Sequence, residues 1–213
     1  MHRAHSTEPA APALVNLSMR ATPLELIREI GLQTRVPIGI IPGQDANALC
    51  GSKSTVVFLG DPPQDSLEAI AQQVHFTLNQ EDGVFVLTAP DVTPHQRDVL
   101  DHRFRMYRTG RKSIVQMISV QLSEKLWTAY AKPAAAGLAG SIPSSANAPK
   151  ISLPPVLHNV TAQDIAALVV KSAPGGIYLS RISPARMDSS NDLKIQFESY
   201  GDPDQLKLDM SCR

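Results

Sequence analysis

A strand–helix pattern that occurs twice in the first 89 residues is the strongest constraint on the fold. The first copy, "VNLSMRATPLELIREIGLQTRV" (15–36), alternates apolar residues, reaches a Thr-Pro pair, and then places apolar residues three apart. The second copy, "TVVFLGDPPQDSLEAIAQQVHFTL" (55–78), keeps this order in different letters. Alternation predicts a half-buried strand, and spacing of three or four predicts an amphipathic helix. The chain therefore predicts repeated strand–helix units.

Four helix starts are predicted from paired side chains. In a capping box, a Ser, Thr or Asp cap and a Glu, Gln or Asp three residues later satisfy each other's backbone N–H groups. The pairs are Thr22 with Glu25, Asp65 with Glu68, Ser113 with Gln116, and Thr161 with Asp164. The apolar faces of the first two helices include Leu24, Ile27, Leu67 and Ile70. Burying each such side chain is worth roughly 1.5–3 kcal/mol, so these faces should pack against strands.

Alternating or β-branched runs flank the predicted helices. The predicted strands are 15–20, 37–41, 54–59, 75–80, 84–89, 103–108, 151–157, 176–180 and 192–199. Pro154 and Pro155 predict that 151–157 is an edge strand or a shortened one. The order of elements predicts an α/β (α+β) fold of two small βαβ-βαββ modules, each a short mixed sheet with two amphipathic helices on one face.

This pattern also predicts the organisation of the chain. The predicted parts are a disordered start (1–14), a first module (15–89), a polar connector (90–102), a second, related module (103–199), and a tail (200–213). Within the second module, residues 132–150 are rich in Pro, Ala, Gly and Ser and predict a long loop.

The first module resembles a known family in its letters. "NLSMRATPLELIREIGLQTRVPIGII" and "VVFLGDPPQDSLEAIAQQVHFTLNQEDGVFVLTA" resemble the short N-terminal (STN) domain shared by secretins and TonB-dependent transporters. The resemblance covers about residues 15–89, and "TPLELIREIGLQTRVPI" is its central element. It implies a periplasmic docking domain that binds other proteins of the bacterial envelope, and not an enzyme.

Composition limits the classes of partner. The chain has 213 residues, 43% hydrophobic and 19% charged, which is typical of a globular protein. Its 20 Lys+Arg balance its 20 Asp+Glu, so no overall field favours nucleic acid or an anionic membrane. No apolar run is long enough to predict a membrane-spanning helix. We expect a periplasmic location if a leader is missing from this sequence, and a cytoplasmic one if Met1 is the true start.

Charge is nevertheless unevenly distributed. Residues 1–89 carry 5 basic and 9 acidic side chains, whereas residues 90–132 carry 8 basic and 4 acidic. The candidate surface for a partner or an anion is Arg103, Arg105, Arg108, Arg111 and Lys112. If 103–108 is a strand, Phe104 and Met106 point to one face, and Arg103, Arg105 and Tyr107 point to the other. This surface could bind nucleic acid, bind an acidic protein surface or the acidic first module, or simply face solvent.

Few residues suggest other chemistry. Cys50 and Cys212 are the two cysteines; without a CxxC motif they predict no metal site, and they could form a disulfide in an oxidising compartment. His95, Asp98 and His102 would share one face of a helix and could hold a divalent metal, but a solvated connector is the favoured interpretation.

We therefore expect no catalytic, cofactor-binding or metal-binding residues. The expected function is that of a non-enzymatic docking module of the bacterial cell envelope, with envelope proteins as partners. The alternative is a cytosolic nucleic-acid-binding protein that uses residues 103–112.

Overall fold

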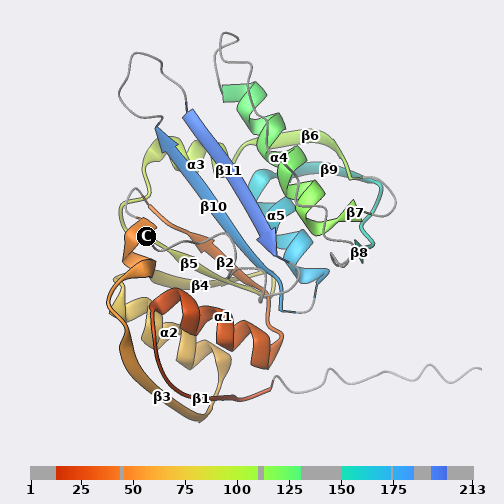
Figure 1. The fold of residues 1–213 in the computed structure, drawn as a ribbon. Helices are drawn as coiled ribbons and strands as arrows, with labels where there is room; N and C mark the ends of the chain where they lie inside the picture. The colour runs from red at the N-terminus through yellow and green to blue at the C-terminus, as the bar shows by residue number, and fades with distance from the viewer. Residues whose placement is uncertain are drawn as a thin grey trace, which may run out of the picture.

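The computed structural model describes residues 13–43, 46–109, 113–130, 150–173, 175–184 and 193–200. Within these ranges, helices and strands combine in small sheets with both parallel and antiparallel pairs, which confirms the predicted α/β (α+β) class. Figure 1 shows the arrangement, with the N-terminal half below and the C-terminal half above and to the right.

The N-terminal half builds a pair of helices between two layers of strands (Figure 1). Its elements are β1 (Val15–Ala21), α1 (Pro23–Thr34), β2 (Ile38–Ile41), the 3-10 helix η1 (Ala46–Cys50), β3 (Ser54–Asp61), α2 (Pro63–Gln73), β4 (Thr77–Glu81) and β5 (Val84–Thr88). β1 pairs with β3 in an antiparallel two-stranded ribbon. β5 pairs with β2 in parallel and with β4 antiparallel, on the other side of the helices.

The C-terminal half repeats part of this plan. Its elements are α3 (Pro94–Leu100), β6 (Arg103–Arg108), β7 (Ser113–Ile114), α4 (Val115–Tyr130), β8 (Lys150–Ile151), β9 (Val156–Thr161), α5 (Ala162–Lys171), β10 (Ile177–Pro184) and β11 (Leu193–Tyr200). β6 and β9 form an antiparallel ribbon, as β1 and β3 do, and β10 and β11 form an antiparallel hairpin, as β4 and β5 do. The run 151–157, predicted as one strand, is divided between β8 and β9 at Pro154 and Pro155.

One sheet joins the two halves, where a separate sheet was expected for each module. β10 pairs in parallel with β2, so the strand order is β11-β10-β2-β5-β4. Tyr178 of β10 lies directly opposite Gly39 of β2, and a Cβ atom at Gly39 would overlap the Tyr178 ring. The missing side chain therefore leaves room for the buried ring at the junction, a close approach that glycine permits.

Hydrogen bonds confirm two of the four predicted capping boxes. The Thr22 N–H donates to Glu25 Oε2 at 2.7 Å, and the Thr161 N–H donates to Asp164 Oδ2 at 2.7 Å. The predicted cap at Asp65 is wrong: α2 begins two residues earlier, at Pro63, without a side-chain cap. Proline suits this first position because its missing N–H would have no partner there. α4 begins at Val115, and Ser113 belongs to β7.

A short helix, α3, occupies the segment predicted as a polar connector. Its cap is a full capping box, in which the Gln96 N–H donates to Thr93 Oγ1 at 3.1 Å and the Thr93 N–H donates to Gln96 Oε1 at 2.7 Å. "TPHQ" at the start of α3 and "TPLE" at the start of α1 share a Thr-Pro pair followed by Gln or Glu at the capping-box position, so the same signal was present in both places.

The predicted core residues are buried. Leu24, Ile27, Leu67 and Ile70 are each 5% exposed or less, which confirms the apolar faces of α1 and α2. The cluster of buried apolar side chains continues into the C-terminal half through Ile118, Ile165 and Ile177. Across the junction, the Gln163 side chain of α5 donates to Glu81 Oε2 of β4 at 2.8 Å.

Candidate interaction surfaces

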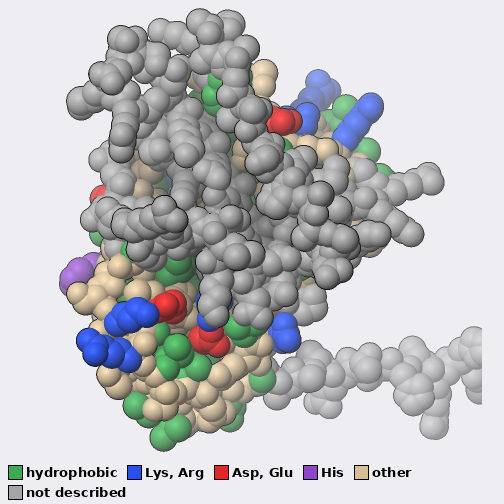
Figure 2. Space-filling view, in the orientation of Figure 1, with side chains coloured by type: hydrophobic (Ala, Val, Ile, Leu, Met, Phe, Trp, Pro, Cys, Tyr) green, Lys and Arg blue, Asp and Glu red, His purple; other side chains and the backbone are tan. Residues whose placement is uncertain are grey.

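The first ribbon, formed by β1 and β3, turns one face to the helices and the other to solvent. Val15, Leu17 and Phe58 on the inner face are buried. The outer face carries Asn16, Ser18, Arg20, Thr55, Val57 and Leu59, all exposed. Val57 is 56% exposed and Leu59 is 75% exposed, the largest value among the exposed large hydrophobic residues. Apolar side chains are visible over β1 and β3 at the lower end of the molecule (Figure 2).

Side chains occupy one end of each edge of this ribbon. On β1, the Gln33 amide bonds to both backbone groups of Asn16: the Asn16 N–H donates to Gln33 Oε1 at 2.9 Å, and Gln33 Nε2 donates to Asn16 O at 3.0 Å. On β3, the Leu59 N–H donates to Asp61 Oδ2 at 3.1 Å. The backbone groups of Asn16 and Leu59 therefore point away from the partner strand.

Backbone direction alternates along a strand, so Thr55 and Val57 also turn their N–H and C=O groups to the outer edge of β3. No described strand pairs with this edge. Among the described residues, it is thus an unpaired strand edge beside an exposed apolar face. Sequence reasoning expected contacts at exposed sheet edges but did not locate this one. The signal was present, because "VVFL" in β3 is a continuous apolar run with more apolar residues than a one-sided ribbon can bury.

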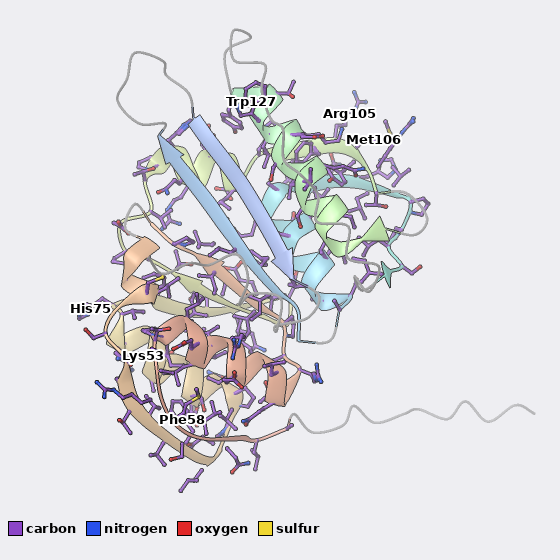
Figure 3. The ribbon with its side chains drawn as sticks, in the orientation of Figure 1. Lys53, Phe58, His75, Arg105, Met106 and Trp127 are labelled. Atoms are coloured by element: carbon purple, nitrogen blue, oxygen red, sulfur yellow. The ribbon has the colours of Figure 1, made fainter. Side chains whose placement is uncertain are left out.

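The second ribbon, formed by β6 and β9, exposes a basic face. Arg103, Arg105, Met106 and Arg108 are exposed, and Figure 3 shows Arg105 and Met106 projecting outward from β6. Tyr107 is fully buried and Met106 is 52% exposed, so the predicted division of this strand into two alternating faces is wrong. Arg111 and Lys112, the other two candidate residues, lie outside the described residues.

A kink in the ribbon explains the error. Asn159 of β9 has a φ of +53°, a left-handed conformation that asparagine tolerates better than most residues, and neither Asn159 nor Arg105 has a partner in the strand register. Before the kink, His102 O accepts from the Ala162 N–H; after it, the Thr109 N–H donates to Pro155 O. In a regular antiparallel ribbon every second residue of a strand bonds to the partner strand, so the bonding residues are all even-numbered or all odd-numbered. In the β6 segment the bonding residue is His102 before the kink and Thr109 after it. The alternation therefore shifts by one residue, and Arg105 and Met106 both face outward.

Arg103 has a structural role at this kink. Its Nη1 atom donates to Asn159 O at 2.6 Å and so satisfies a carbonyl group that the strand ladder leaves without a partner. The described residues give Arg105 and Arg108 no such hydrogen bond and no ion pair. Neither β6 nor β9 contains an acidic residue. The outer face of the second ribbon is therefore positively charged, and two of its guanidinium groups are available to a ligand.

Aromatic contacts hold the histidines that sequence reasoning considered as metal ligands. The rings of His95 and His102 both pack edge-on against Tyr130, with centroids 5.9 and 5.4 Å apart. The Tyr130 hydroxyl donates to Asp98 O at 2.9 Å. Burial raises the pKa of Tyr130, and the negative charges of Asp98 and Asp101 raise it further. These contacts support a packing role for the two histidines.

In the structure, Cys50 is disulfide-bonded, and Cys212, the other cysteine of the sequence, lies outside the described residues. The described part of the chain contains no group of three or more His, Cys, Asp or Glu side chains that could hold a metal ion. Nor does any described helix have the length and apolar character needed to cross a membrane. No protein-family model, curated protein or solved structure matches this chain.

Proposed function

We propose that this protein is a non-enzymatic docking module of the bacterial cell envelope, and that its first ribbon binds an extended segment of a partner protein. The proposal rests on the exposed apolar face at Val57 and Leu59 beside an edge of β3 that no described strand pairs with. An open edge presents unused N–H and C=O groups, to which an extended peptide can add as a further strand.

The two edges of the ribbon differ at the end where Asn16 pairs with Leu59, and in the apolar residues that β3 alone exposes. On β1, the Gln33 amide already occupies the backbone groups of Asn16, as a neighbouring strand would. On β3, the Asp61 carboxylate occupies only the N–H of Leu59, and no strand in the described part of the chain pairs with Thr55 and Val57 at this edge. Outward side chains of a strand added to β3 would lie beside Val57 and Leu59, and each such cross-strand pair would contribute roughly 0.2–1 kcal/mol.

Two further features support the envelope as the location. Disulfides persist in oxidising compartments such as the bacterial periplasm and are rare in the cytosol, and Cys50 is disulfide-bonded. Residues 15–89 also resemble the STN domain, whose relatives dock in the periplasm.

Site-specific photo-crosslinking in cells of the source organism tests the proposal. A photoactivatable residue at Val57 should give one discrete adduct with an envelope protein, whereas the same residue at Ala69, exposed on α2, should not. Adding Thr55→Pro should abolish the adduct, because proline removes an outward-facing N–H while leaving the bonds to β1 in place. The same adduct from both positions, or an adduct that survives Thr55→Pro in a folded protein, would contradict docking at this edge.

A further inference from the structure

The second ribbon has the chemistry of a separate binding surface. Arg105 and Arg108 project outward on either side of the exposed Met106, and Arg103 is already bonded to Asn159 O. Figure 2 shows Lys and Arg side chains at the upper right of the molecule, where β6 lies in Figure 1, with apolar atoms beside them. Two guanidinium groups that have no partner among the described residues, with a methionine between them in the strand, match carboxylates that flank one apolar side chain.

We propose that the second ribbon binds an acidic segment of a partner polypeptide, whose carboxylates pair with Arg105 and Arg108 and whose apolar side chain contacts Met106. Arginine suits this role because its planar guanidinium can bond a carboxylate through two N–H groups. Methionine is flexible and polarizable, so it adapts to apolar partners of different shapes. This surface lies on a different ribbon from the proposed strand-addition edge and does not depend on it.

The orientation of the aromatic side chains favours a polypeptide over a single-stranded nucleic acid. Proteins that bind single-stranded nucleic acid hold the bases by stacking them on exposed aromatic rings in a basic groove. Here Tyr107 is fully buried, its ring centroid 5.4 Å from that of Phe104, which is itself only partly exposed. The arginines could still contact phosphates, but neither ring of the strand is presented to a base.

The same surface is poorly suited to a membrane. Protein segments that lie within the lipid interface bury a broad apolar face in addition to presenting basic residues. Met106 is the one residue of β6 and β9 among the exposed large hydrophobics. Anionic vesicles therefore serve as a comparison in the test and are not the expected ligand.

The experiment measures binding of a fluorescent nine-residue peptide of Asp and Glu around one central Leu, by anisotropy at 50 and 300 mM NaCl. We expect binding at 50 mM NaCl that weakens with salt, because exposed charge pairs are screened. The double variant Arg105→Gln/Arg108→Gln should bind roughly two- to thirtyfold more weakly, since it removes two exposed charge pairs that are each of modest strength. Arg20→Gln, which removes an exposed arginine from the first ribbon, is the matched control and should change nothing.

A charge-reversed variant provides a second test of the acidic-peptide site. Arg105→Glu/Arg108→Glu should lose the acidic peptide and bind its Lys counterpart. A dissociation constant above about 1 mM at 50 mM NaCl, equal binding of an Asn/Gln version of the peptide, or no effect of the double Gln variant would each overturn the proposal. Tighter binding to oligothymidine or to phosphatidylglycerol vesicles than to the acidic peptide would also overturn the proposal, because the ligand of this surface would then be nucleic acid or lipid. Thr55→Pro should leave binding of the acidic peptide unchanged. The test of strand addition at β3 and the test of peptide binding at the second ribbon can therefore fail independently.

Discussion

The two ribbons occupy corresponding places in the two halves of the molecule, yet they present opposite chemistry. Each is an antiparallel pair of strands outside a pair of helices (Figure 1). The first is in regular register from Asn16 to Ala21 and exposes Val57 and Leu59, with Arg20 as the one charged residue of its outer face. The second is kinked opposite Arg105 and exposes three arginines.

The difference shows that backbone geometry, and not residue type alone, decides the chemistry of such a face. With strict alternation, Arg108 would lie on the face opposite to Arg103 and Arg105. The shift at Asn159 brings all three guanidinium groups to the outer face and turns Tyr107 into the core. One residue in a left-handed conformation thus concentrates charge that the sequence distributes over two faces.

The largest expected effect tests whether the two halves are one cooperative unit. Leu67→Ala in α2 and Ile165→Ala in α5 each remove a fully buried side chain and should each lower the free energy of unfolding by about 2–5 kcal/mol. Because β2 and β10 belong to one sheet, both variants should shift the same single urea transition. Two transitions, each moved by only one variant, would show that the halves unfold independently. Gln72→Ala, at an exposed position of α2, is the control.

An intermediate effect is expected at the kink of the second ribbon. Asn159→Val should lower the free energy of unfolding by about 1–2 kcal/mol, because a β-branched residue disfavours positive φ. Asn159→Gly, which accepts this conformation, should change stability by less than half as much. Urea unfolding of the two variants measures the difference. If valine were tolerated as well as glycine, the kink would not depend on positive φ at this position.

The smallest effect concerns the capping box of the first half. The Thr22 N–H bond to its carboxylate, aided by Lys53, holds the pKa of Glu25 below its usual value of 4.5. A lowered pKa in the folded state means that the ionised carboxylate adds stability above pH 4.5, and that this stability is lost as pH falls through the lowered pKa. Since the Glu25 side chain is 39% exposed, the loss should be roughly a few tenths of a kcal/mol.

Chemical denaturation between pH 5 and pH 3 measures this loss. Glu25→Gln reproduces the uncharged box of Thr93 and Gln96 in α3 and should lose less stability over the same range. An equal loss in both proteins would show that Glu25 is not the titrating group.

Local signals predicted much of the fold. The boxes at Thr22 and Thr161 were predicted because a cap and its partner lie only three residues apart. The start of α2 was misplaced because Asp65 fits the spacing, whereas Pro63 at the first helical position was the better signal. α3 was missed because a polar stretch outweighed the same letters that mark α1.

Features that depend on distant residues could not be predicted in the same way. The outward position of Met106 follows from the conformation of Asn159, which belongs to another strand 53 positions later in the sequence. The shared sheet depends on Tyr178 meeting Gly39, and neither residue is unusual in its own segment. The surface arginines were found from composition, but their common face was not.

The parallel pairing of β2 and β10 also has a consequence for any attempt to divide the protein. Cutting the chain after α3 would leave "IGII" at the margin of a three-stranded sheet, where its neighbour on one side had been removed. An exposed apolar strand edge can pair with strands from other molecules and lead to aggregation. The N-terminal half should therefore precipitate when expressed alone, however well its own helices are capped.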